Sequence, residues 1–229
     1  MRDGIMNLQK KIIACLPGDS FSDNFVKSII NLTAWAALAG HNLRLSFAKS
    51  CNIYYVRNMC LGGQVMAGKD QKPFQGEHYD YILWIDSDQV FNPEDLDKLI
   101  KRDLDIVGGL YLMEGGMKYA AVKDWDENFF KKYGCFNFLT PADTKHTIAP
   151  IEVAYTGFGF LLVKHGVFET MEYPWFRQKM INIGNMKDAC MEDVYFCLTA
   201  RENGYKIYVD PTVIVGHEKK EVLFPGKIK

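Results

Sequence analysis

Residues 81–88 read Tyr81-Ile82-Leu83-Trp84-Ile85-Asp86-Ser87-Asp88, a continuous apolar run that ends in two carboxylates. An unbroken apolar run of this length is typical of a strand that is buried on both faces of a parallel or mixed sheet. In open α/β sheets, ligands collect just beyond the carboxyl ends of the strands. The run therefore predicts a central strand that places Asp86 and Asp88 at a ligand-binding edge, where such a pair can hold a divalent cation.

Position distinguishes this pair, because the chain contains several Asp-x-Asp pairs: Asp86/Asp88, Asp95/Asp97, Asp103/Asp105 and Asp124/Asp126. The second and third pairs lie in or beside the helix-like stretch 92–103, with Asn92 as N-cap and Pro93 at the first helical position. Their carboxylates are expected to cap and solvate that helix. The fourth pair lies in a polar, aromatic loop that no apolar run precedes. The first pair alone follows a predicted buried strand.

The composition argues against one class of partner. The 229 residues carry 27 Lys and Arg against 28 Asp and Glu, a formal net charge of -1. A nonspecific nucleic-acid binder normally has an excess of basic residues, so no nucleic-acid partner is expected. The short basic groups Lys131-Lys132 and Lys219-Lys220 are predicted to be solvated surface.

The cysteines and the apolar runs indicate the compartment. No C-x-x-C pair occurs among the six cysteines, which we expect to be reduced: Cys15, Cys51, Cys60, Cys135, Cys190 and Cys197. The apolar stretch 12–16 is too short for a signal peptide, and no run approaches the roughly 20 apolar residues that cross a bilayer. We therefore expect a soluble, cytoplasmic protein without a transmembrane segment.

Strands and helices alternate through the first half of the chain. Strands are predicted at 11–16, 43–47, 81–85 and 105–111, and helices at 25–40, 53–66 and 93–103. Such alternation indicates an α/β sheet of mostly parallel order.

The second half of the chain has a different pattern. Residues 119–140 are aromatic and irregular, and 151–164 predict a strand, a glycine-bent turn and a second strand. Residues 172–189 show little periodicity and are expected to form a lid or binding loop. A helix at 191–203 opens with Glu192-Asp193, and short strands at 206–210 and 212–215 lead to His217.

These pieces, in this order, resemble the nucleotide-sugar-dependent glycosyltransferases of the GT-A fold. The resemblance is greatest to the inverting family 2 group and its small viral and phage members, including the chlorella virus enzymes that decorate capsid protein. It rests on Leu16-Pro17-Gly18-Asp19-Ser20, Arg57-Asn58, Ile85 to Asp88, Gly157 to Phe160, Glu192-Asp193 and His217. It is weakest over 112–150 and 172–189.

The resemblance implies one GT-A domain over 1–229 with a Rossmann-like, mixed and mostly parallel central sheet flanked by helices. Residues 1–111 would form the nucleotide-binding half, and 112–217 the acceptor-binding and catalytic half with a smaller β region. Residues 218–229 would be a tail, which we expect to be a mobile end. The implied activity is metal-dependent transfer of a sugar, with inversion, from a nucleoside diphosphate sugar, taken as a UDP-sugar. The acceptor would be a hydroxyl of a glycan or glycoprotein.

The resemblance also assigns the metal site. Asp88 would bind Mn²⁺ or Mg²⁺, hard cations that prefer oxygen ligands and bridge phosphate oxygens. Asp86 would be a partner in this site or would contact the ribose or a metal-bound water. His217 would complete the metal site or contact phosphate; without the resemblance, a lone histidine there reads as a surface residue.

Two further groups of residues receive roles from the resemblance. Asp193 would be the catalytic base, with Glu192 as a second candidate, although acids in a first helical turn commonly serve only the helix dipole. Arg57 would contact base or phosphate, with a helix-surface arginine as the alternative. The remaining implied contacts are Pro17, Gly18, Asp19, Ser20, Ser87 and Gly157 for the nucleotide sugar, and Tyr155 and Trp175 for the acceptor.

Two alternatives stay open. A sugar nucleotidyltransferase can have a similar sheet, but it usually carries a glycine- and arginine-rich loop after the first strand, which Leu16-Pro17-Gly18-Asp19-Ser20-Phe21 lacks. The second alternative is a non-catalytic protein of the same fold that binds a carbohydrate or a nucleotide, since fold alone does not establish activity.

Overall fold

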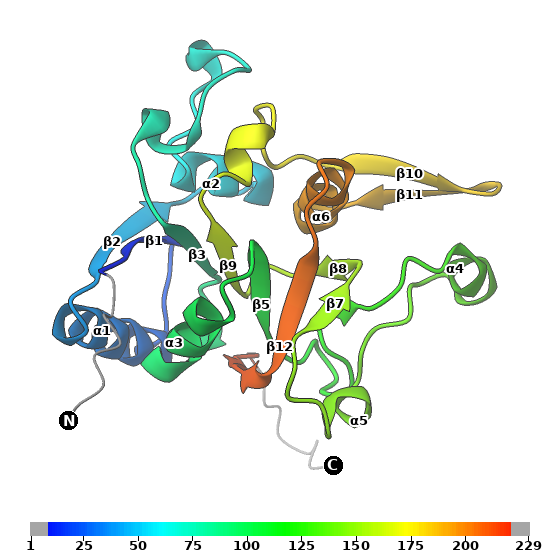
Figure 1. The fold of residues 1–229 in the computed structure, drawn as a ribbon. Coiled ribbons are helices and arrows are strands. Elements are labelled where there is room, and N and C mark those ends of the chain that lie inside the picture. Colours follow the sequence, from blue (N-terminus) through cyan, green and yellow to red (C-terminus); the bar gives the residue numbers. More distant parts are fainter. Residues whose placement is uncertain (1–8, 221–229) are drawn as a thin grey trace, which may run out of the picture.

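A seven-stranded mixed sheet runs through the middle of the molecule (Figure 1). The computed structural model describes residues 9–220. The strands are β1 Lys11–Pro17, β2 Asn42–Ala48, β3 Tyr81–Ile85, β4 Gln89–Val90, β5 Ile106–Leu110, β6 Ala121–Val122, β7 Ile151–Val153, β8 Tyr155–Thr156, β9 Phe160–Lys164, β10 Lys179–Ile183, β11 Met186–Cys190, β12 Ile207–Ile214 and β13 Gly216–His217. The α-helices are α1 Asp23–Leu38, α2 Ile53–Cys60, α3 Pro93–Arg102, α4 Glu127–Tyr133, α5 Pro141–Thr144 and α6 Glu192–Glu202, with short 3₁₀ turns at Val65–Ala67, Pro73–Gly76 and Phe168–Thr170.

The order of the strands confirms the predicted mixed, mostly parallel sheet. The order is β2-β1-β3-β9-β5-β12-β7. The pairs β1/β2, β1/β3 and β5/β12 are parallel, whereas β9 lies antiparallel between β3 and β5, and β7 lies antiparallel to β12. The carboxyl ends of β1, β3 and β5 therefore point to one edge of the sheet, the edge that carries Asp86.

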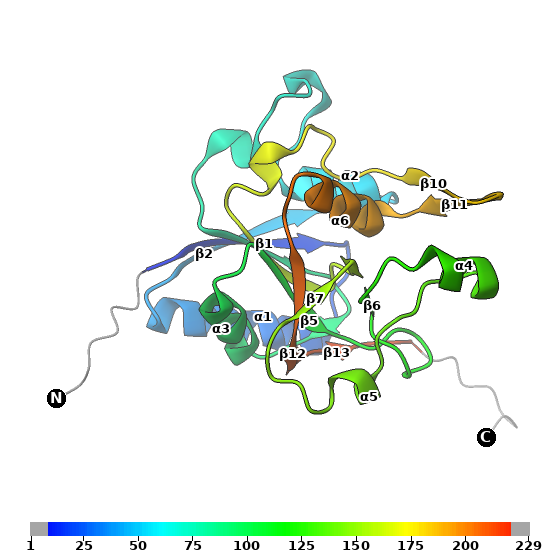
Figure 2. The ribbon, with the colours of Figure 1, turned by 45° about the vertical axis from the view of Figure 1, so that its right-hand side comes forward.

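Helices cover both faces of the sheet: α1 and α3 lie on one side, and α2 and α6 lie on the other (Figure 2). Successive side chains of a strand point to opposite faces of the sheet, so one strand contributes to the apolar layers on both faces. In β1, Ile12 and Leu16 belong to the apolar cluster on the side of α1 and α3, whereas Ile13 and Cys15 belong to the cluster on the side of α2 and α6. All five residues of β3 are buried, as its unbroken apolar run predicts.

Two predicted boundaries were wrong. The helix predicted over 53–66 ends at Cys60, because Gly62 adopts a φ of +75° and Gly63 packs closely. A Cβ on Gly63 would lie 2.8 Å from the Asn58 carbonyl oxygen and 2.8 Å from the ring of Tyr173. The two short strands predicted before His217 form the single strand β12, whose register shifts between Asp210 and Ile214.

Two segments predicted to lack regular structure contain elements. Residues 119–140 include β6 and α4, and residues 172–189 include the antiparallel hairpin β10–β11. Helix α4 and the hairpin project from the same side of the molecule and contact each other (Figure 1). No helix within residues 9–220 is both long and apolar enough to cross a membrane. The tail predicted from residue 218 lies partly outside the described residues, which end at Lys220.

Candidate active site

The loop after β1 and the loop after β3 meet at the carboxyl edge of the sheet. Gly18 has a φ of +148°, and a Cβ there would come within 3.0 Å of the Ser87 Cβ. Pro17 is buried, whereas Asp19 and Ser20 are exposed beside this contact. The structure thus brings together the residues predicted to contact a nucleotide after the first strand and those after the third.

Asp88 and His217 also meet, although 129 positions separate them. Strand β13 pairs antiparallel with β4 and sets His217 opposite Gln89. His217 Nε2 lies 2.9 Å from Asp88 Oδ2, and Nδ1 lies 2.6 Å from the Leu112 carbonyl oxygen. Because a carbonyl oxygen can only accept, Nδ1 carries a hydrogen and Nε2 faces the carboxylate. A carbonyl oxygen that accepts from the other ring nitrogen commonly orients a metal-binding histidine in this way.

The electrostatics keep Asp88 ionised. Burial alone would raise the pKa of the Asp88 carboxyl, but hydrogen bonds and charges from His217 and Lys219 outweigh it and lower that pKa to about 2. The hydrogen bond with Asp88 in turn raises the pKa of His217 above its ordinary value. A carboxylate that is charged at neutral pH is the kind of oxygen ligand that Mg²⁺ and Mn²⁺ prefer.

Lys219 belongs to the same group: its side chain is exposed, as predicted, and its ammonium also contacts the site. Its Nζ lies 3.2 Å from Asp88 Oδ2 and 2.6 Å from His217 Nε2. The positively charged ammonium of Lys219 thus lies against the Asp88 oxygen and the His217 nitrogen. These two atoms are therefore compatible with a neighbouring cation. Within residues 9–220, no three His, Cys, Asp or Glu side chains gather as metal ligands. Two protein ligands are nevertheless a normal number for an ion that also binds substrate phosphates.

Arg57 links two of the predicted site carboxylates. Its Nε donates to Glu192 Oε1 at 2.9 Å, while Nη1 and Nη2 donate to Asp86 Oδ1 at 2.9 Å and Oδ2 at 3.2 Å. Its guanidinium carbon lies 4.9 Å from the ring centroid of Phe158, a cation–π distance. Burial would lower the pKa of Arg57, but the charges of Asp86 and Glu192 raise it above its ordinary value. Arg57 is 3% exposed and is therefore not a helix-surface arginine.

Asp193 begins α6 beside Glu192 but has different partners. The Tyr155 hydroxyl donates to Asp193 Oδ2 at 2.7 Å, and the backbone N–H of Val194 donates to Oδ1 at 2.7 Å. Burial and the charge of Glu192 raise the pKa of Asp193 above its ordinary value, against the effect of those two hydrogen bonds. A carboxylate with a raised pKa in a cleft is a candidate general base.

A cavity of about 320 Å³ opens beside Asp193. Its aromatic lining comes from the segment around α4 and from β8, and comprises Trp125, Phe130, Phe136, Phe138 and Tyr155. Asp188 and Asp193 are its charged lining residues. Trp175 is not among the residues that line it: its side chain is 1% exposed and lies in the core on the side of α2. The structure thus brings Tyr155 to Asp193 and leaves Trp175 inside the protein.

Tyr111 lies at the centre of the site, and the sequence analysis did not identify it. Its ring centroid is 5.2 Å from that of His217, and its hydroxyl accepts from the Gly159 N–H at 3.2 Å. A Cβ on Gly157 would lie 2.0 Å from the Tyr111 hydroxyl oxygen. The glycines at 157 and 159 therefore make room for this tyrosine. Its position directly after β5, at the same sheet edge as Asp86, was the signal that could have found it.

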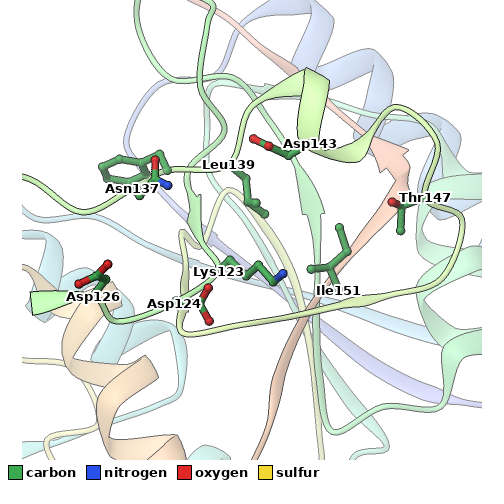
Figure 3. Close-up of a pocket in the computed structure, with 9 residues that line it drawn as sticks. Lys123, Asp124, Asp126, Asn137, Leu139, Asp143, Thr147 and Ile151 are labelled. Carbon is green, nitrogen blue, oxygen red and sulfur yellow. The ribbon is translucent and has the colours of Figure 1, made fainter. Parts of the chain in front are cut away.

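A second cavity, of about 430 Å³, shares Phe138 with the first (Figure 3). Figure 3 shows Asp124 and Asp126 near one end of it and Asp143 on the side of α5. Two of these carboxylates accept hydrogen bonds at the start of a helix. Asp126 accepts from the backbone N–H groups of residues 128 and 129 at the start of α4, and Asp143 accepts from Thr140 in a capping box. These two carboxylates of the cavity lining therefore cap the starts of α4 and α5.

Comparison with solved structures supports the same architecture. The chain superposes on A197 from STIV with a TM-score of 0.52 and 17% sequence identity, covering 96% of this chain and 98% of that one. It superposes on GalNAc-T7, crystallised with UDP, GalNAc and Mn²⁺, with a TM-score of 0.53 and 12% identity, covering 93% of this chain and 44% of that one. No protein-family model matches the chain, and no curated protein sequence matches it. The fold is GT-A-like, as the order of the motifs predicts.

Proposed function

We propose that this protein is a metal-dependent glycosyltransferase that moves a sugar from a nucleoside diphosphate sugar, taken as a UDP-sugar, to an acceptor hydroxyl with inversion. The proposal is carried by the surroundings of Asp193. This partly buried carboxylate has a raised pKa and lines an aromatic cavity, and the fold around it is GT-A-like. The Asp88–His217 pair at the neighbouring sheet edge supports it.

The donor would lie along the carboxyl edge of the sheet. Gly18 and Ser87 adjoin there, with Asp19 and Ser20 exposed next to them, so a nucleoside has both backbone and hydroxyl partners. Asp88 and His217 would hold Mn²⁺ or Mg²⁺. When bound, that ion would neutralise negative charge on the diphosphate as the glycosidic bond breaks. Asp86, whose carboxylate Arg57 fixes, would contact the ribose.

Asp193 would perform the proton chemistry. Its carboxylate would take the proton of an acceptor hydroxyl while that oxygen attacks the anomeric carbon and the nucleoside diphosphate leaves from the opposite side. The Tyr155 hydroxyl orients the carboxylate through the 2.7 Å hydrogen bond. Glu192 is less suited to this role, because its carboxylate is 6% exposed and bound to Arg57.

The acceptor would occupy the cavity beside Asp193. Aromatic rings offer stacking surfaces for the apolar faces of a sugar, and a few polar groups fix its orientation. Trp125 and Phe136, whose ring centroids are 4.1 Å apart, form one such surface. The cavity's charged groups are both acidic, which favours an uncharged glycan over an anionic one.

Replacement of Asp193 tests the proposal. The full chain would be incubated with UDP-, GDP- and dTDP-sugars, Mn²⁺ and a set of neutral saccharides, with release of nucleoside diphosphate and formation of glycoside both measured. Asp193→Asn should lower transfer by about 10² or more and leave donor affinity nearly unchanged. Asp188→Asn is the matched control, because Asp188 lines the same cavity but is exposed.

Four outcomes would contradict parts of this proposal. Turnover of Asp193→Asn near that of the wild type would exclude Asp193 as the base. Undiminished metal-dependent transfer by Asp88→Ala would exclude Asp88 as a ligand. Release of pyrophosphate from a nucleoside triphosphate and a sugar phosphate would identify a nucleotidyltransferase, and nucleotide binding without any turnover would identify a binding protein.

A further inference from the structure

The ammonium of Lys219 completes a close triangle with Asp88 and His217. Asp88 Oδ2 and His217 Nε2 are 2.9 Å apart, and Lys219 Nζ lies 3.2 Å from the first atom and 2.6 Å from the second. The ammonium thus touches one atom of each residue that is assigned to the divalent ion.

Both atoms that face the ammonium belong to the residues assigned to the ion. Lys219 Nζ contacts Asp88 Oδ2 and His217 Nε2, while the other ring nitrogen, Nδ1, contacts the Leu112 carbonyl oxygen at 2.6 Å and so fixes the ring. Lysine brings three N–H donors on one compact charge. The ammonium therefore lies where a cation held by Asp88 and His217 would lie.

The backbone places Lys219 at this position. Strand β13 pairs with β4, and the N–H of Glu218 continues the ladder by donating to the Asp88 carbonyl oxygen at 2.8 Å. The Glu218 carboxylate accepts from the Ser22 hydroxyl and, at 2.8 Å, from Asn24 Nδ2 at the start of α1. The segment that carries Lys219 is thus tied to two elements of the fold.

We propose that Lys219 is an internal cation that occupies the position of the divalent ion, so that the ion binds only by displacing the Lys219 ammonium. This inference rests on the metal assignment in the proposed function. An ammonium donates hydrogen bonds and cannot ligate a metal, so it and the ion exclude each other. The Lys219 side chain is 48% exposed on a flexible stem, which leaves it free to swing out into solvent.

Direct titration of Mn²⁺ tests the displacement without reference to transfer. The EPR signal of free aqueous Mn²⁺ would be followed as the full-length chain is added, for the wild type, Lys219→Met, Lys219→Arg and Lys220→Met. Lys219→Met should bind Mn²⁺ about three- to tenfold more tightly, since breaking a half-exposed ion pair no longer opposes the ion. Lys219→Arg keeps a competing cation and should stay close to the wild type.

Lys220→Met is the matched control, because it removes the same charge one residue further along, where the side chain is exposed. Its Mn²⁺ affinity should change by less than about twofold, as expected for a screened surface charge. Equal affinities of the wild type and Lys219→Met, or equal gains in the two methionine variants, would overturn the inference while leaving metal-dependent transfer intact. Absence of Mn²⁺ binding in every variant would overturn both the inference and the metal assignment, and the transfer assay would then report separately on the proposed activity.

Discussion

Replacement of Arg57 by methionine should destabilise the protein strongly. Arg57 is the shared partner of Asp86 and Glu192, whose side chains are 28% and 6% exposed. Methionine keeps much of the apolar stem and can pack against the Phe158 ring. It removes the positive charge, however, and leaves two carboxylates without their partner in the protein interior.

The size of the effect follows from this burial. Breaking a buried ion pair by removing one partner typically costs about 3–5 kcal/mol, mostly because the other charge stays buried without compensation. Glu192 carries most of that cost, because Asp86 is reached by solvent. For a domain of about this size, each kcal/mol lowers the melting temperature by about 2–4 °C, so a loss of about 6–20 °C is expected.

Urea unfolding of the wild type, Arg57→Met and a surface control measures this cost. Arg44→Met is the control: Arg44 also pairs with a carboxylate, Glu77 at 2.6 Å, and also lies over an aromatic ring, but its side chain is 44% exposed. Its replacement should cost no more than about 1 kcal/mol. The free energy of unfolding should therefore separate the two variants by more than about 2 kcal/mol at neutral pH.

Two further measurements identify the buried charge as the cause. Arg57→Met should regain stability as the pH falls, because an uncompensated carboxylate has a raised pKa in the folded state, and such a group destabilises the fold only once it is ionised. Adding Glu192→Gln should recover part of the loss for the same reason. If Arg57→Met cost no more than Arg44→Met, the buried network would not hold the site together and the reasoning would fail.

Three other predictions concern the packing around Tyr111 and the protonation of Asp193. Gly157→Ala would bring a Cβ to 2.0 Å from the Tyr111 hydroxyl oxygen, so urea unfolding should show a loss of about 1–3 kcal/mol; an unchanged midpoint would mean that Tyr111 moves aside at no cost. Because burial raises the pKa of Asp193, kcat/KM should increase with pH through an acid limb above the ordinary aspartate value of about 3.9. The hydrogen bond from Tyr155 lowers that pKa, so Tyr155→Phe should move the limb to higher pH; a limb that stays in place would argue against Asp193 as the base.

The features predictable from sequence were those that a local pattern encodes. The apolar run of β3 and the two carboxylates after it needed no information from elsewhere in the chain. Helix α3 was also predictable, because Asn92 and Asp95 form its capping box and Pro93 begins it. Strand β9 was predicted as a strand, but its antiparallel place between β3 and β5 depends on pairing that no local pattern specifies.

The missed elements lacked the expected periodicity. Strand β11, which pairs with β10, has three exposed residues in succession. Its sequence therefore lacks the alternation of apolar and polar residues that would predict a strand. Helix α4 spans seven residues, too few for an apolar stripe to repeat, although Asp126 at its N-cap and Gly134 after it were usable signals. The contact of Lys219 with Asp88 spans 131 positions and depends on the pairing of β13 with β4.

The partners of the site carboxylates explain why one of them is suited to proton transfer. Arg57 neutralises Asp86 and Glu192, and His217 and Lys219 surround Asp88. Among residues 9–220, no lysine, arginine or histidine forms a hydrogen bond or ion pair with Asp193, which has a tyrosine hydroxyl and one backbone N–H instead. A carboxylate held by a buried cation gains little from accepting a proton, whereas one that burial destabilises gains more. Asp86, Asp88 and Glu192 are therefore held by cations, whereas Asp193 is the carboxylate of this group whose surroundings suit the proposed proton transfer.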